Sequence, residues 1–72
     1  MKVSKTQAVL LILSTLLEKG NVSKEEIKDM IEVSDLSFKR YMQEIRAFIA
    51  NFNLCIEVVY NRETNKYYIK NL

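Results

Sequence analysis

The sequence of 72 residues has no histidine, no proline and no tryptophan, and it has only one glycine and one cysteine. Without histidine, the chain lacks the side chain that most often acts as a general base or a metal ligand. The single Cys55 excludes an intramolecular disulfide and a cysteine-cluster metal site, which fits a reducing compartment. The chain also has no glycine-rich loop, so we predict that the protein is not an enzyme and uses no metal, cofactor or small-molecule ligand.

Long hydrophobic runs are also missing. The longest apolar stretch, residues 8–17, is too short to cross a bilayer core of about 30 Å, and no small-residue cleavage motif follows it. We therefore predict no membrane association and a cytoplasmic location. Hydrophobic residues make up 49% of the chain, which is enough for a core, and the length allows one domain, residues 1–72.

The charge is unevenly distributed. Five lysines and five acidic residues balance in residues 1–33, whereas six cationic residues face four acidic ones in residues 34–72. The net charge of +2 therefore belongs to the second half of the chain.

The first predicted helix covers residues 5–19. Ser4 and Gln7 have the form of a capping box, and Gly20 is a natural helix stop. Its inward face would contain Val9, Ile12, Leu13 and Leu16. The helix also has apolar residues off that face, namely Leu10, Leu11 and Leu17. A helix that is apolar nearly all round is either buried on two sides or has a partner, so both a covered core helix and a homodimer contact through these leucines remain open.

A second helix, residues 24–32, follows the capping-box pair Ser23 and Glu26. Its predicted inward residues are Ile27, Met30 and Ile31. Ser34 caps a third helix, residues 35–51. Its inward side would contain Phe38, Met42, Ile45, either Phe48 or Ile49, and Phe52, and its outward side Asp35, Leu36, Lys39, Arg40, Gln43 and Arg46.

After the third helix the period changes from 3.6 to 2, which predicts a β-hairpin over residues 54–70. Residues 61–65, "NRETN", have turn chemistry. Cys55 is expected to be buried or half-buried, and the aromatic residues to be core or core margin; these are Phe38, Phe48, Phe52, Tyr60, Tyr67 and Tyr68. Three helices followed by a hairpin give an α+β fold, a helix-turn-helix with a two-stranded wing, that is, a winged helix.

The stretch "VSKEEIKDMIEVSDLSFKRYMQEI" resembles the helix-turn-helix of DeoR-type and WYL-domain regulators and of the N-terminal domains of antiterminator-like activators. Val33 and Ser34 match the valine-serine pair of that pattern, Ser37 stands where the family has threonine, and Arg40 falls on its arginine. "YYI", residues 67–69, matches the return strand of its wing. Asp35 departs from the pattern, because that position is often basic and an acid there would repel phosphate.

This resemblance implies sequence-specific binding to double-stranded DNA by a small transcriptional regulator or its DNA-binding domain. The third helix would enter the major groove, where Lys39 and Gln43 would read bases while Ser37 and Arg40 hold phosphates. Leu36 would either touch a thymine methyl or pack under the neighbouring helix. The complete predicted DNA-binding set is Ser37, Lys39, Arg40, Gln43, Arg46, Arg62 and Lys66. The alternative is a winged-helix module that binds a protein partner, or a second copy of itself, through the first helix and does not bind DNA.

Overall fold

The computed structural model describes residues 2–72, and it has the α+β class that the sequence predicts. Three helices and three strands follow one another along the chain. They are α1 (Lys5–Lys19), β1 (Asn21–Ser23), α2 (Lys24–Met30), α3 (Asp35–Asn51), β2 (Ile56–Asn61) and β3 (Lys66–Asn71). The bounds of α1 and α3 coincide with the predicted ranges, whereas α2 is shorter than predicted.

The strand β1 is an element that the sequence analysis missed. It joins the hairpin to form a three-stranded antiparallel sheet in the order β1-β3-β2, with Val22 opposite Tyr67. Only three residues long and placed between a helix stop and a capping serine, β1 is too short to show alternation. It forms because β3, from the far end of the chain, supplies its hydrogen-bonding partner.

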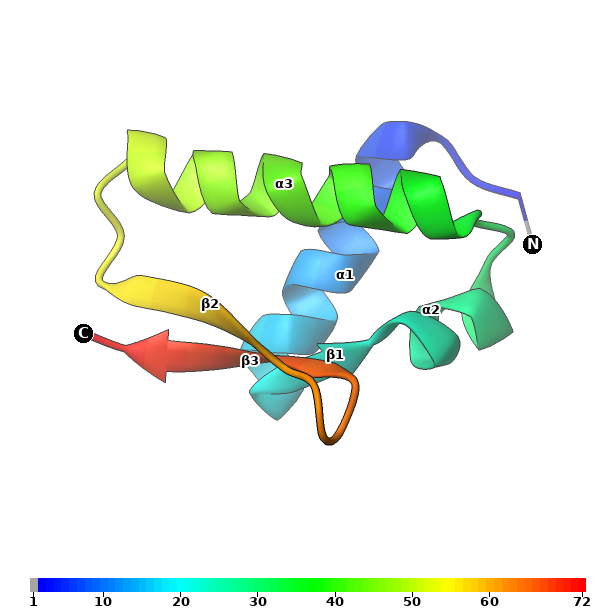
Figure 1. Cartoon of the computed structure of the whole chain (residues 1–72). Helices are drawn as coiled ribbons and strands as arrows, with labels where there is room; N and C mark the ends of the chain where they lie inside the picture. Colours follow the sequence, from blue (N-terminus) through cyan, green and yellow to red (C-terminus); the bar gives the residue numbers. More distant parts are fainter. Residues whose placement is uncertain (1) are drawn as a thin grey trace.

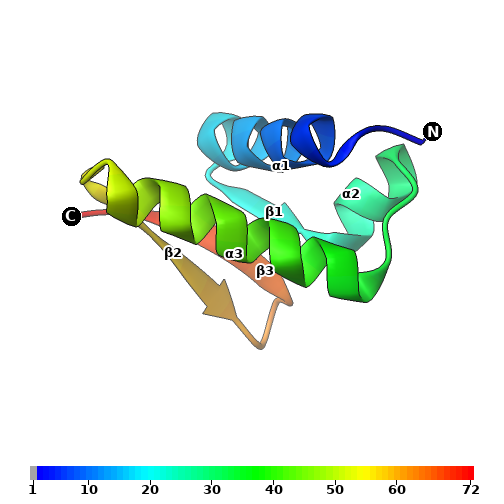
Figure 2. The same ribbon diagram turned by 90° about the horizontal axis from the view of Figure 1, so that it is seen from above.

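The helices and the sheet enclose one core. Figure 1 shows α3 running along the hairpin while α1 crosses behind it, and Figure 2 places α1 and the hairpin on either side of α3. The three helices, β1, β2 and the turn residue Ile31 contribute buried side chains to this core, and β3 packs Tyr67 and Ile69 against it. The largest fully buried side chains are Phe38, Ile12, Leu16, Ile27, Ile45 and Val22.

The helix α1 begins and ends where its capping residues predict. The Ser4 hydroxyl accepts a hydrogen bond from the Gln7 N–H at 3.2 Å, and Gly20 adopts a left-handed conformation with φ +81°. The buried face differs from the predicted one, since it contains Ala8, Ile12, Thr15 and Leu16, while Val9, Leu11 and Leu13 are half-buried. Leu10 and Leu17 are each 57% exposed. The exposed Leu10 and Leu17 show that α1 is not buried on two sides. Leu11 is not available for a dimer contact in the way predicted, because it packs against the core.

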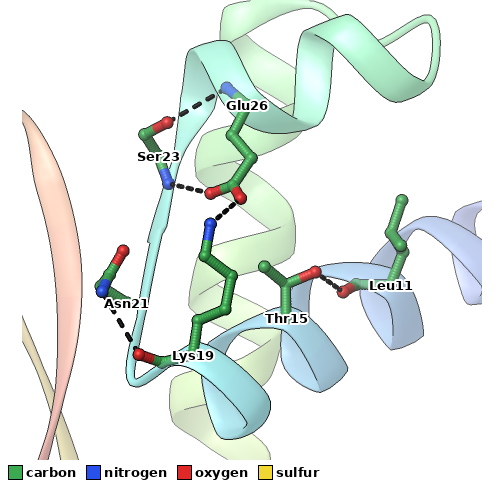
Figure 3. Close-up of polar contacts among 6 residues, drawn as sticks. All are labelled: Leu11, Thr15, Lys19, Asn21, Ser23 and Glu26. Atoms are coloured by element: carbon green, nitrogen blue, oxygen red, sulfur yellow. Dashed lines mark hydrogen bonds and ion pairs between the residues drawn. The ribbon is translucent and has the colours of Figure 1, made fainter.

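Polar groups close the space between α1, β1 and α2 (Figure 3). The Ser23 hydroxyl accepts from the Glu26 N–H at 3.1 Å and the Glu26 carboxylate accepts from the Ser23 N–H at 3.4 Å, so the predicted capping box is present. The same carboxylate forms an ion pair with Lys19 at the end of α1. The buried Thr15 donates to the Leu11 carbonyl at 2.8 Å, which satisfies its hydroxyl within the helix.

The prediction that α2 continues to residue 32 with Met30 facing inward is wrong. The helix ends at Met30, which is 45% exposed, and Ile31 is the C-cap in an extended conformation. Leaving the helix turns Ile31 into the core, where it is 4% exposed. Ile31 is therefore buried as predicted, but in an extended conformation after the helix and not as part of a longer helix.

The third helix resolves the alternative between Phe48 and Ile49 and corrects the prediction for Phe52. Ile49, not Phe48, occupies the inward position, and Phe48 and Phe52 are 42% and 66% exposed instead of lying in the core. Their rings pack on each other with centroids 5.2 Å apart. Phe52 follows the last helical residue as the C-cap, so the helical period no longer decides where its side chain lies.

The hairpin begins two residues later than predicted. Leu54 and Cys55 precede β2, and Cys55 is exposed, which contradicts the prediction of a buried or half-buried thiol. At the turn, the Asn61 carboxamide oxygen accepts from the N–H groups of Glu63 and Thr64, and Asn65 takes a left-handed φ of 57°. Among residues 2–72, no helix is long and apolar enough to span a membrane.

Candidate nucleic-acid interface

A groove runs between α3 and the β2–β3 hairpin, and we call it the α3–hairpin groove. Its larger part has a volume of about 400 Å³ and is also lined by Lys24 and Glu25 of α2 and by Asp35, and its smaller part has a volume of about 190 Å³. The two parts adjoin each other, because both are lined by Lys39 from α3 and by Tyr60 and Tyr67 from the hairpin.

Three predicted DNA-binding residues lie together along this groove. Lys39, Gln43 and Arg46 are all exposed and line its smaller part. Their spacing of four and three residues places them on one flank of a helix with 3.6 residues per turn. Next to this flank, Phe38 and Met42 of the same helix are buried in the core, and they fix the orientation of α3 about its axis. The flank therefore combines two cations and an amide on a rigid helix.

The hairpin side of the groove is aromatic. The ring of Tyr67 lies 4.7 Å from that of Tyr60 and 5.8 Å from that of Phe38, measured between centroids. The Tyr60 hydroxyl donates to the carboxamide oxygen of Asn65 at 3.1 Å, which ties the end of β2 to the turn. Tyr60 was predicted to lie in the core or at its margin, but it is 41% exposed and lines the groove.

Tyr60 and Asn65 are site residues that the sequence analysis did not propose. Alternation along β2 places Tyr60 on the inward face of the hairpin, but the core ends before that position is reached. Tyr60 could have been identified from the sequence, because it is the last inward-facing residue of the strand before the polar turn. Asn65 lines the same groove from the turn itself.

Arg40 lies elsewhere on α3. It is exposed, it does not line the α3–hairpin groove, and it has no acidic partner within 4.0 Å among residues 2–72. One residue beyond Lys39, it is turned a further 100° or so around the helix, away from the hairpin. Leu36 is likewise exposed, at 59%, so it does not pack under the neighbouring helix.

The N-terminus of α3 carries a pair of linked hydroxyls. The Ser34 hydroxyl accepts from the Ser37 N–H at 3.1 Å and donates to the Ser37 hydroxyl at 3.0 Å. Ser34 is therefore the helix cap, as predicted. Because the Ser37 hydroxyl acts as an acceptor in this pair, its own proton can be donated to an approaching anion.

Asp35, one residue into α3, forms ion pairs with two lysines of α2. Its carboxylate binds Lys28 through one oxygen and lies 3.4 Å from the Lys24 ammonium through the other. Hydrogen bonds from Lys28 and then Lys24 lower the pKa of Asp35. The negative charge that would repel phosphate is thus offset by two cations.

The two remaining predicted residues, Arg62 and Lys66, are exposed at the hairpin turn and do not line the groove. Lys66 opens β3 next to Tyr67, so its side chain points to the opposite face of the sheet from Tyr67. Its charge contributes to lowering the pKa of Glu26 in α2. Arg62 and Lys66 therefore form a separate cationic tip beside the groove.

Comparison with known proteins finds no family model that matches the chain, no similar curated protein and no similar solved structure. The groove, the helix that forms it and the charges around it are therefore the features from which a function can be inferred.

Proposed function

We propose that this protein is a winged helix-turn-helix that binds double-stranded DNA in a sequence-specific way, as a transcriptional regulator or as the DNA-binding domain of one. The observation that carries this proposal is the alignment of Lys39, Gln43 and Arg46 on the flank of α3 that faces the hairpin. The order of elements supports it, because α2 and α3 are joined by a short turn and are followed by a β-hairpin.

In this proposal α3 enters the major groove, which is wide enough for an α-helix. Seventeen residues give α3 a length of about 25 Å, so its exposed flank can follow several base pairs. Gln43 pairs with the edge of adenine and Lys39 with that of guanine. Arg46 reaches the same DNA from the next turn of the helix.

Phosphate contacts come from both sides of the reading helix. Ser37 and Arg40 hold the backbone near the start of α3, and the cationic tip of Arg62 and Lys66 holds it beside the hairpin. If the five cations Lys39, Arg40, Arg46, Arg62 and Lys66 all neutralise phosphates, log K should fall with log salt at a slope of about −4.

A protein-interaction role without DNA binding is the second candidate. The exposed Leu10 and Leu17 favour it, because large apolar side chains on one helix are typical of interaction surfaces. The small net charge of +2 also favours it.

Fluorescence-anisotropy titration of labelled mixed-sequence duplex DNA at several salt concentrations distinguishes the two candidates. The wild type is compared with Lys39→Ala and Arg46→Ala, and with Lys5→Ala as a matched control that removes an equal charge from α1. DNA binding predicts affinity that falls with salt, and a slope about one unit shallower in the two α3 variants. A folded wild type that does not bind at low salt, or a Lys5→Ala variant as weak as the other two, would refute the proposed interface.

A further inference from the structure

The outer face of α1 carries a regular apolar line, which we call the α1 seam: Thr6, Leu10, Leu13 and Leu17. The intervals of four, three and four residues are those of the contact positions in a coiled coil. Leu10 and Leu17 are each 57% exposed, Leu13 is half-buried and Thr6 is exposed. A second α-helix is the element whose surface fits such a line.

The fold covers the α1 seam only in part, because Leu13 packs against the core while Thr6, Leu10 and Leu17 stay exposed. The opposite side of α1 contains Ala8, Ile12 and Leu16, which are buried against the rest of the protein. Figure 2 shows α1 along one edge of the molecule, with β1 and α3 on one side of it. None of the four seam residues is ionic, and the charge next to them is that of the exposed Glu44 of α3, at the border of the seam.

One edge of the seam continues onto α3. Leu10 and Leu13 line a depression of about 210 Å³ together with Glu44 and Phe48 of α3, and the Phe48 ring packs on that of Phe52. The other edge is polar, with the exposed Gln7 and Ser14. The leucine line therefore has an edge with two phenylalanines and one acid on one side and an uncharged polar edge on the other.

We propose that a second copy of this chain occupies the α1 seam, with the two α1 helices antiparallel about a two-fold axis. In this register Leu10 of one copy lies opposite Leu13 of the second copy, and Thr6 lies opposite Leu17. The two-fold axis is perpendicular to both helices, so each edge of the seam meets the same edge of the second copy. The polar edges therefore meet each other, and Phe48 and Phe52 lie on the same side of the interface as Phe48 and Phe52 of the second copy. The seam is thus complementary to itself.

The available area supports a dimer of modest size. Leu10, Leu17, Phe48 and Phe52 expose roughly 400 Å² of apolar surface per copy, about half of the 800 Å² or so that each partner buries in a standard interface. Thr6, Gln7, Leu13 and Ser14 supply further area between and beside them. The dimer does not depend on the proposed function. It leaves the α3–hairpin groove uncovered, because the α3 residues that line the groove, such as Lys39 and Gln43, differ from those that border the seam, such as Phe48.

Sedimentation velocity over a range of micromolar concentrations tests the dimer, with circular dichroism to check that each variant is folded. Leu10→Glu and Leu17→Glu should each raise the dimer dissociation constant by about a hundredfold or more, because every dimer would then bury two carboxylates. Leu36→Glu is the matched control, since Leu36 has nearly the same exposure, 59%, but lies on α3. A monomeric wild type overturns the proposal, and so does a dimer that survives both seam substitutions.

Disulfide trapping tests the antiparallel register. In a Cys55→Ser background, Thr6→Cys and Leu17→Cys proteins are mixed and oxidised. The mixture should give a heterodisulfide, whereas Leu17→Cys alone should give none, because the two copies of position 17 would lie about 16 Å apart along the helices and a disulfide needs Cα atoms within about 7 Å. Efficient crosslinking of Leu17→Cys alone would indicate parallel helices and refute the register.

Discussion

Asp35 at the start of α3 forms an ion pair with Lys28 near the end of α2, and this contact spans the turn between the two helices. Lys24, one turn earlier on α2, approaches the same carboxylate at 3.4 Å. Asp35 therefore has two effects that oppose each other in the proposed DNA complex. It orients α2 against α3, and it keeps two lysines occupied that could otherwise neutralise phosphate.

Replacing Asp35 by asparagine should strengthen DNA binding. The substitution removes a negative charge from the proposed interface and releases Lys24 and Lys28, so we expect the affinity at low salt to rise by roughly fivefold. Anisotropy titrations at low salt measure the change. Glu44→Gln is the matched control, because it removes the same charge from α3 beside α1, away from the hairpin. Equal gains in both variants would indicate a general effect of net charge.

Gln43 and Arg46 should differ in what their loss changes. We expect Gln43→Ala to relax the preference for one base and to leave the salt slope unchanged, because an amide contact to a base edge releases no counterion. We expect Arg46→Ala to reduce the slope by about one and to weaken binding to all sequences alike. Selection from a random duplex pool, followed by titration of the selected sites, separates the two effects. The roles assigned to these residues would be wrong if Gln43→Ala changed the slope and Arg46→Ala changed the preference.

The starts of the three helices and the end of α1 could be predicted because their signals are local. Ser4, Ser23 and Ser34 each accept a hydrogen bond from the N–H three residues later, and Gly20 ends α1 with a left-handed residue. These contacts depend on side chains within one turn of the chain, so the order of residues is enough to identify them.

The features that were missed depend on contacts between distant segments. β1 exists because Val22 pairs with Tyr67, and no periodicity in three residues can indicate that. Helical spacing identifies Phe48 and Ile49 as apolar neighbours but does not decide which of them faces the core, because that depends on how α1 crosses α3. For the candidate site, spacing alone aligns Lys39, Gln43 and Arg46, whereas the addition of Tyr60 and Asn65 needs the hairpin to fold against α3.

The Glu26 side chain should make the stability of the fold depend on pH. A hydrogen bond from Lys19 and one from the Ser23 backbone lower the pKa of Glu26 below its ordinary value of 4.5. Burial raises this pKa, but its effect is smaller than that of the hydrogen bond from Lys19. A group with a lowered pKa in the folded state stabilises the protein fully above its unfolded pKa, and this contribution is lost as the pH falls through the folded pKa. The contribution of Glu26 should therefore be complete above about pH 5 and decline below pH 4.5.

Urea unfolding of the wild type and Glu26→Gln at a series of pH values measures this contribution. Glutamine keeps the ability to cap the Ser23 N–H, so the difference reports the charge, and we expect about 0.5 kcal/mol near neutral pH that shrinks in acid. Glu25→Gln removes a charge from the same first turn without breaking an ion pair, and gives the helix-dipole effect for comparison. A difference between wild type and Glu26→Gln that is constant with pH would contradict the assignment.

Phe38 and Phe52 provide a direct test of the corrected core, since both belong to the apolar pattern of α3 but only one is buried. Phe38 is 2% exposed and Phe52 is 66% exposed. Phe38→Leu should lower the free energy of unfolding by about 1–2 kcal/mol, because leucine fills only part of the space that the buried ring occupies. Phe52→Leu should change it by less than about 0.5 kcal/mol. Denaturant unfolding should be carried out at a protein concentration low enough to keep the chain monomeric, since Phe52 also borders the proposed dimer surface. Equal losses in the two variants would place Phe52 in the core and would remove one edge of that surface.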